Sequence, residues 1–125
     1  MTLGEYQALQ CKNMTEAELV DNIISLAQRL DWLVAHFRPA MLADGRYRTA
    51  VQGDGKGFPD LVLVRDSSPR LLFAECKSET GKLTKEQEEW LRRLRLAHYK
   101  AAVWVWRPSD WFDGTIETVL ARRRE

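Results

Sequence analysis

The sequence predicts an α/β protein in which a mixed β-sheet carries helices on its faces. Three observations support this fold class: apolar residues recur at helical spacing between residues 15 and 30, short apolar runs rich in Val, Leu and Trp follow, and a second helical pattern lies between the last two runs. A chain of 125 residues, 45% of them hydrophobic, is long enough for one compact domain and too short for two. We therefore expect one domain over residues 1–125, with 1–13 and 121–125 peripheral or flexible, and the element order helix, strand, strand, strand, helix, strand.

The first helix is predicted to begin after Thr15. A hydroxyl side chain at this position caps exposed amide groups, and the acidic residues Glu16 and Glu18 complement the partial positive charge of the first turn. Apolar residues then recur with helical spacing, at Leu19, Ile23, Leu26 and Leu30. This pattern is typical of an amphipathic helix packed on a core.

Three strands are expected next. Residues 32–37 form a short apolar run, and 39–57 form a long polar connection with four glycines, which is either a mobile loop or a ragged hairpin. Residues 61–65 and 71–77 are two further apolar runs, and the turn-forming residues 66–69 join them. The two runs are therefore predicted to form a hairpin.

A second helix and a last strand follow. Thr84 can cap a helix over residues 85–98, which has Trp90, Leu91, Leu94 and Ala97 on its apolar side. The nearly continuous apolar run 101–106 predicts a strand buried on both faces. Pro108 ends it, and 109–120 is expected to be helical or irregular.

Composition excludes several classes of protein. The formal charge of +1 does not indicate a nucleic-acid binder, although Arg92, Arg93 and Arg95, and the terminal run 122–124, could form basic patches or simply solvated helix faces. Two distant cysteines without CxxC spacing argue against a zinc site and a disulfide framework. Neither a signal peptide nor an apolar run long enough to span a bilayer is present, so we expect a cytoplasmic protein without membrane association.

Three ionisable residues are predicted to meet at one edge of the sheet. Asp60 opens one strand of the hairpin, and Glu75 and Lys77 end the other strand, two residues apart and therefore on one face. In an antiparallel hairpin the start of the first strand lies beside the end of the second. Two carboxylates at this separation repel each other unless a cation lies between them, and oxygen ligands favour Mg²⁺ or Mn²⁺. Lys77 could then orient a water molecule or neutralise developing negative charge, which suits hydrolysis of a phosphodiester.

The alternative is that Asp60 caps a turn and Glu75 forms an ion pair with Lys77 on a wet face, because a D…ExK pattern is short and common. Its context favours the chemical interpretation. Both acids border apolar runs, residues 61–64 and 71–74, where unpaired charge would be costly.

The segments 56–64 (KGFPDLVLV), 73–78 (FAECKS) and 81–87 (GKLTKEQ) together resemble the VRR-NUC branch of the PD-(D/E)XK nucleases. The resemblance covers about two thirds of the chain and implies a restriction-endonuclease-like core related to Holliday junction resolvases. It further implies a metal-dependent deoxyribonuclease of a type frequent in phages, which would act in the host cytoplasm if phage-encoded.

By this resemblance, Asp60 and Glu75 correspond to metal-binding acids, Lys77 to the catalytic lysine and Gln87 to a glutamine that hydrogen-bonds near the active site. Gln87 could also be a solvated helix residue. The family tends to carry a further glutamate on the first helix. Glu16 shares the stripe of the buried residues, whereas Glu18 lies on the wet side, so Glu16 is chosen as the third metal ligand. Its alternative role is to complement the helix dipole.

Further residues are candidates for DNA contacts, packing or a dimer interface. His36, Lys56, Lys82 and Arg92 are candidate DNA contacts, and His36 could instead be a structural residue. Cys76 should point away from Glu75 and Lys77 and is assigned to packing. Trp104 and Trp106 are expected to be core or interface aromatics. Because a small domain covers little of a duplex, a homodimer is predicted, with Trp90, Trp104, Trp106 or Trp111 as its contacts.

The predicted function is therefore a Mg²⁺- or Mn²⁺-dependent endonuclease that cleaves DNA, including branched or junction DNA. The alternatives are a catalytically silent DNA-binding accessory module with the same fold, and a structural protein whose polar residues form a salt-bridge network. Neither the preferred DNA structure nor a partner helicase follows from the sequence.

Overall fold

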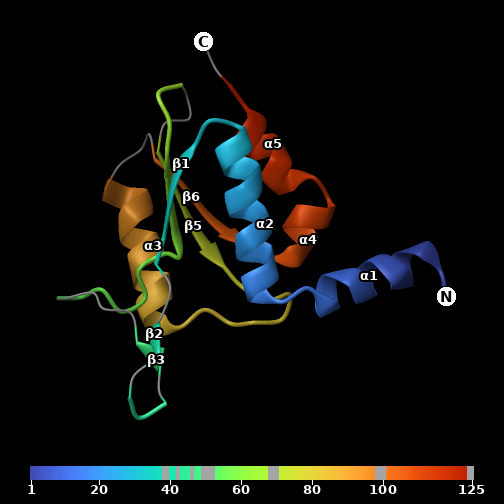
Figure 1. The fold of residues 1–125 in the computed structure, drawn as a ribbon, viewed down its shortest axis with the longest axis horizontal. Coiled ribbons are helices and arrows are strands. Elements are labelled where there is room, and N and C mark those ends of the chain that lie inside the picture. Colours follow the sequence, from blue (N-terminus) through green and yellow to red (C-terminus); the bar gives the residue numbers. More distant parts are fainter. Residues whose placement is uncertain are drawn as a thin grey trace.

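The fold is a three-layer arrangement in which a four-stranded sheet lies between helix α3 on one side and helices α2, α4 and α5 on the other (Figure 1). The computed structural model describes residues 1–37, 40–41, 43–45, 47–48, 53–67, 71–97 and 101–123. The helices are α1 (Leu3–Asn13), α2 (Glu16–Arg29), α3 (Lys85–Ala97), α4 (Pro108–Phe112) and α5 (Thr115–Ala121). The strands are β1 (Leu33–His36), β2 (Ala40–Met41), β3 (Tyr47–Arg48), β4 (Leu61–Val64), β5 (Leu71–Cys76) and β6 (Ala102–Trp106). Within the described ranges, every helix is too short or too polar to cross a membrane.

The main sheet has the order β1-β4-β5-β6. The pairs β1–β4 and β4–β5 are antiparallel, and the pair β5–β6 is parallel, so the sheet is mixed as predicted. Leu61 pairs with Ala74 and Leu63 with Leu72, which puts these four residues on one face. This face packs on α2 and α5 and forms the core, whereas Phe73 and Glu75 alternate to the face covered by α3.

Helix α2 begins where its cap predicts. The Thr15 side chain accepts a hydrogen bond from the Glu18 amide at 3.1 Å, and the Glu18 side chain reaches back to the Thr15 amide, which completes a capping box. Leu19, Ile23 and Ala27 of this helix are completely buried. The predicted amphipathic helix is therefore confirmed, and its apolar stripe faces the sheet.

Two predictions about the C-terminal half need correction or completion. Strand β6 is not buried on both faces, because it lies at the edge of the sheet and only Trp106 among its residues is fully buried. Residues beyond Pro108 form two short helices, and α5 contributes Ile116 and Leu120 to the core. Helices α4 and α5 therefore cover the part of the apolar sheet face that α2 leaves open.

Helix α1 was not predicted, and it projects from the body with no buried residue (Figure 1). Thr2 and Glu5 form its capping box, which stabilises the start of the helix locally, and the helix contacts the body through α4. Within the predicted connection 39–57, β2 and β3 form a short ladder, so the hairpin alternative is confirmed for these four residues. Parts of three predicted segments lie outside the described residues. They are Ser68 and Pro69 of the β4–β5 turn, His98 of the second helix and Arg124 of the terminal run.

Candidate active site

The acidic residues meet at the end of the sheet where β4 begins and β5 ends. The β4–β5 register, continued by one residue, puts Asp60 directly opposite Glu75 and on the same face. An Asp60 carboxylate oxygen accepts a hydrogen bond from the Cys76 amide at 2.9 Å, which fixes the aspartate against β5. The structure thus brings Asp60 and Glu75 together, as the hairpin argument predicts.

Glu75 is a buried carboxylic acid, with 1% of its surface exposed. Burial and the charge of the neighbouring Asp60 carboxylate raise its pKa to about 9. One of its oxygens, Oε1, accepts a hydrogen bond from Gln87, whereas Oε2 is buried without a hydrogen-bond donor among the described residues. At neutral pH this pair therefore holds a proton unless a cation replaces it.

Glu16 lies within electrostatic reach of the same pair, and Glu18 is used elsewhere. Burial of the Glu16 carboxyl and the charge of Asp60 raise the pKa of Glu16, while Lys77 acts in the opposite direction. The Glu18 side chain instead accepts a hydrogen bond from the Thr15 hydroxyl at 2.9 Å. Glu16 is therefore within electrostatic reach of Asp60 and Lys77, whereas Glu18 is engaged in the capping box. The residue Glu16 as a whole is exposed and not part of the buried stripe, although its carboxyl is partly desolvated.

Gln87 connects the first turn of α3 to Glu75. Its Oε1 accepts a hydrogen bond from the Thr84 amide at 2.9 Å, and its Nε2 donates to Glu75 Oε1 at 3.0 Å. The Thr84 hydroxyl in turn accepts from the Gln87 amide at 3.1 Å. Because the amide oxygen of Gln87 is already used in this capping box, only its NH₂ group can face Glu75.

Lys77 directly follows β5, and its amide donates a hydrogen bond to the carbonyl of Trp106 at 3.0 Å. Its positive charge opposes the rise in the pKa of Glu75 and of Glu16, so its ammonium group is within electrostatic reach of both acids. Cys76 points to the opposite face and is fully buried in the core. Burial and the nearby acids raise the pKa of its thiol well above the usual value, which argues against a nucleophilic role.

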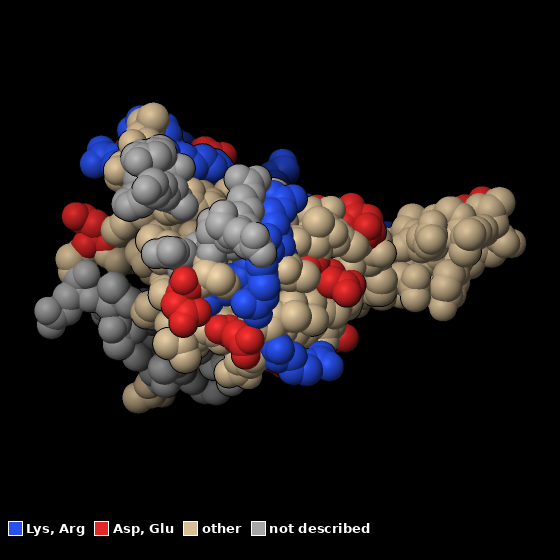
Figure 2. Space-filling model, turned by 90° about the horizontal axis from the view of Figure 1, so that it is seen from above, with Lys and Arg blue, Asp and Glu red and all other residues tan. Residues whose placement is uncertain are grey.

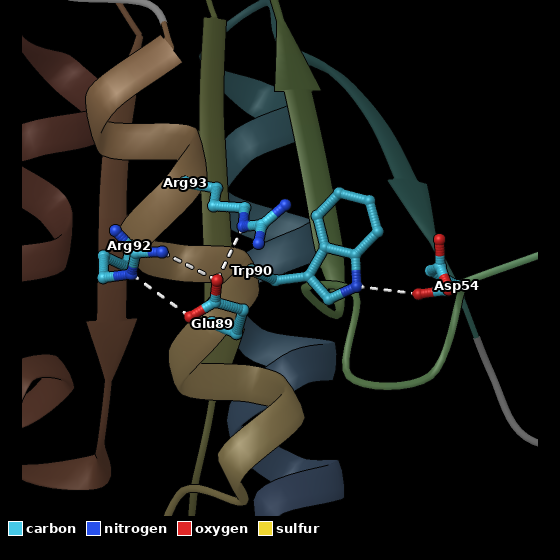
Figure 3. A network of polar contacts seen from close by, with 5 residues as sticks. All are labelled: Asp54, Glu89, Trp90, Arg92 and Arg93. Atoms are coloured by element: carbon cyan, nitrogen blue, oxygen red, sulfur yellow. Dashed lines mark hydrogen bonds and ion pairs between the residues drawn. The ribbon is translucent and has the colours of Figure 1, made fainter.

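The loop that carries Asp60 is clamped to α3, a feature that the sequence analysis missed. Phe58 makes edge-to-face contacts with Trp90 at 5.0 Å, Phe37 at 5.3 Å and Phe73 at 6.2 Å between ring centroids. The Trp90 indole also donates to the Asp54 carbonyl at 2.9 Å (Figure 3). The aromatic residues Phe58 and Trp90 were visible in the sequence, but no local pattern links positions so far apart.

Gly57 makes this clamp close. Its φ of +86° is accessible to glycine, and a Cβ atom there would lie 2.6 Å from the carbonyl carbon of Glu86 and 2.7 Å from the amide nitrogen of Gln87. The loop before Asp60 therefore lies directly on the backbone of the helix turn that carries Gln87.

The four candidate DNA contacts lie on different elements of the fold. His36 pairs with Leu61, which places it on the α2 face of the sheet, opposite to Glu75. Lys56 forms an exposed ion pair with Glu86 at 3.5 Å. Lys82 is exposed in the β5–α3 connection, the segment between Lys77 and Gln87.

The predicted basic residues are partly paired with acidic ones. Arg92 and Arg93 share the Glu89 carboxylate, at 2.7 and 2.6 Å (Figure 3), so one of their two positive charges is offset. The C-terminal basic residues lie at the end of the molecule opposite to the start of α2 (Figure 1), where Figure 2 shows Lys and Arg side chains interleaved with acidic ones. There Arg65 donates to the carbonyls of Leu120 and Arg122 and stacks over Trp32 at 4.1 Å. Arginine at this end therefore anchors α5 rather than flanking the acids.

The chemistry of the donor set fits a hard divalent cation. Within the described part of the chain, no three Asp, Glu, His or Cys side chains already stand at ligand spacing. Asp60 and Glu75 lie opposite each other on the paired strands, and Glu16 is close enough to shift the pKa of Glu75. The buried Oε2 of Glu75, which has no hydrogen-bond donor within the described residues, is an oxygen that a cation would satisfy.

The chain matches a known protein-family model. The family model described as the VRR-NUC domain matches residues 5–105, and this range includes all five of the residues at the site: Glu16, Asp60, Glu75, Lys77 and Gln87. No curated protein and no solved structure matches the chain.

Proposed function

The chain belongs to the VRR-NUC domain family of nuclease domains, and from this membership we propose that it is a Mg²⁺- or Mn²⁺-dependent endonuclease of the PD-(D/E)XK type. Family membership makes it a DNA-processing domain with DNA as substrate. The observation that carries the finer proposal is the buried Glu75 carboxylate opposite the half-buried Asp60, with one oxygen of Glu75 that has no hydrogen-bond donor among the described residues.

Asp60, Glu75 and Glu16 are the residues that would hold the cation. When bound, a divalent cation supplies Lewis acidity toward a phosphate oxygen and lowers the pKa of a water molecule. Glu75 is held in place from the other side, because Gln87 occupies its Oε1 and leaves Oε2 for the cation. Asp60 is likewise held by the Cys76 amide. The two strands and α3 therefore preorganise the ligands.

Lys77 is the proposed catalytic cation. Its charge acts on the acids, and in a DNA complex it would lie beside the phosphate that these acids address. There it would orient the attacking water or offset the negative charge that develops on the phosphate oxygens. Gln87 touches Glu75 and not the substrate, so its proposed role is to position that ligand.

The proposed substrates include branched or junction DNA, and the proposed active form is a homodimer that cuts two strands. Among the tryptophans expected at a dimer contact, Trp106 is fully buried in the core and is not available. Trp90 is engaged with Phe58 and Asp54, and Trp104 is half-buried and stacked on Trp106 at 6.1 Å. Trp111, which packs against the core, and the edge strand β6 remain as candidates. Light scattering at assay concentrations tests the dimer, and a monomer with full activity would refute it.

The test of the function is cleavage of a labelled panel of linear, nicked, flapped and four-way DNAs with Mn²⁺, Mg²⁺ or EDTA. We expect cleavage only with the metal ions. Lys77→Ala should reduce the rate by about a hundredfold or more while DNA binding is retained, because removal of one group that stabilises developing charge costs on the order of 10²–10³ in rate. Lys12→Ala, on the exposed helix α1, is the matched control and should cleave normally.

The result also separates the alternatives. A silent DNA-binding module would bind the panel without cutting it, and a salt-bridge network would show no Mn²⁺-dependent rise in melting temperature. A Lys77→Ala variant that cleaves like the unmodified protein would remove this lysine from the mechanism.

A further inference from the structure

Arg107 directly follows β6 and holds the segment that connects Lys77 to Gln87. Its Nη1 donates hydrogen bonds to the carbonyls of Ser78 at 2.7 Å and Gly81 at 2.6 Å, and a longer one to Glu79 at 3.4 Å. Three carbonyl oxygens that converge on one point repel one another without a positive charge between them. The guanidinium group of Arg107 therefore stabilises the conformation in which the carbonyls of residues 78–81 converge.

The arginine itself stands on a rigid support. It is the N-cap of α4, where its amide donates to the Asp110 carboxylate at 2.9 Å and the following Pro108 is buried. A second bond, from the Ser109 amide to the Glu79 carboxylate at 2.9 Å, ties the same segment to the start of α4. Helix α4 and the segment 78–81 are thus joined by two charged side chains: Arg107 donates to carbonyls of the segment, and Glu79 of the segment accepts from an amide of α4.

The segment 78–81 is a tight turn. The Gly81 amide donates to the Ser78 carbonyl at 3.3 Å, and a Cβ atom on Gly81 would lie 2.8 Å from the Ser78 hydroxyl oxygen. Lys77 precedes this turn, and the Lys77 amide bonds the Trp106 carbonyl, one residue before Arg107. Thr84 and Gln87, which hold Glu75, follow the turn along the chain.

We propose that Arg107 is a positioning residue for the nuclease reaction, which acts by fixing the turn that places Lys77 beside the carboxylates of Asp60 and Glu75. This inference rests on the proposed function. The carboxylates are held by strand pairing and by Gln87, so loss of Arg107 disturbs Lys77 more than the metal ligands. A displacement of about 1 Å in a catalytic group can cost on the order of a hundredfold in rate.

The experiment compares Arg107→Ala, Arg107→Lys and Arg95→Ala for kcat, KM and Mn²⁺-induced thermal stabilisation. Arg95 is the matched control, because it also donates to a backbone carbonyl, that of Val103, but on an exposed helix face away from the turn. We expect Arg107→Ala to lower kcat by about 10- to 100-fold, with KM and the Mn²⁺ effect changed less than about threefold. Arg107→Lys should recover most of the rate, since an ammonium group also offers three donors to the carbonyls.

Hydrogen exchange at the amides of residues 77–83 supplies a readout that does not depend on turnover. In Arg107→Ala exchange should accelerate in this segment, while the protection of β4 and β5 stays unchanged. The inference is overturned if Arg107→Ala leaves hydrogen exchange in residues 77–83 or kcat unchanged, or if Arg95→Ala loses as much kcat. A rise in KM alone would also overturn it, because it would mean that Arg107 binds DNA directly. If the unmodified protein cuts no DNA, the proposed function and the catalytic part of this inference both fail, and exchange still decides whether Arg107 holds the turn.

Discussion

Replacement of Gly57 by Ala tests whether the loop before Asp60 must lie directly on helix α3. The new Cβ atom would stand 2.6 Å from the Glu86 carbonyl carbon and 2.7 Å from the Gln87 nitrogen, which are backbone atoms and cannot rotate away. The loop and the first turn of α3 would therefore have to separate. Because Asp60 follows on one side of the contact and Gln87 lies on the other, the separation would open the acidic site.

The cost has two parts. A residue with a Cβ atom at φ +86° pays about 1–2 kcal/mol for the left-handed conformation. Overpacking against a rigid neighbour adds about 1–3 kcal/mol. The total of about 2–5 kcal/mol is a large part of the roughly 5–15 kcal/mol that stabilises an ordinary domain.

Gly114→Ala is the matched control. Gly114 has the same φ of +86°, but a Cβ atom there meets nothing within 4 Å, so this variant carries the conformational cost alone. The difference between the two variants isolates the contact with α3. It should be about 1–3 kcal/mol, or roughly 3–15 °C in melting temperature for a chain of this size.

Thermal melting and DNA cleavage with Mn²⁺ measure both effects. Gly57→Ala should melt below Gly114→Ala and cleave more slowly at temperatures where both remain folded, whereas Gly114→Ala should keep its rate. Equal melting temperatures for the two variants would refute the close contact. A normal cleavage rate in a destabilised Gly57→Ala would show that the contact stabilises the fold without positioning the site.

Three further predictions concern the carboxylates. Since the pKa of Glu75 is raised to about 9 from 4.5, the folded metal-free protein binds more protons between these pH values than the unfolded chain. The contribution of this group to stability is therefore complete below about pH 4.5 and is lost as the pH rises through about 9. In EDTA, the melting temperature of the unmodified protein should fall over this pH range, and Glu75→Gln should remove that fall. Glu16→Gln should reduce the stabilisation by Mn²⁺, whereas Glu18→Gln should lower the melting temperature without changing the Mn²⁺ effect, and the reverse pattern would exchange their roles. Gln87→Leu should weaken Mn²⁺ binding and cleavage about tenfold, because it leaves a buried Glu75 oxygen unsatisfied at a cost of about 1–3 kcal/mol, and a titration with unchanged affinity would argue against that.

Local patterns in the sequence predicted the elements that matter most for the site. The apolar runs 61–65 and 71–77 and the turn-forming residues between them were enough to predict an antiparallel hairpin, and pairing in that hairpin puts Asp60 opposite Glu75. The cap at Thr15 predicted where α2 begins. These signals are short-range, because a strand's two faces and a helix's first turn are set by neighbouring residues along the chain.

Contacts between distant segments decided the rest. The chemistry of the acids, and the family to which the chain belongs, follow from motifs that can be read along the chain. In contrast, three features depend on which element covers which face of the sheet. They are the edge position of β6, the contact of Phe58 with Trp90 and the hydrogen bonds from Arg107 to the turn after Lys77. The same packing puts Arg122 and Arg123, which follow α5, at the end of the molecule away from the acids. Residue spacing predicts how a segment folds and which of its faces is apolar, but only the assembled core determines what that face meets.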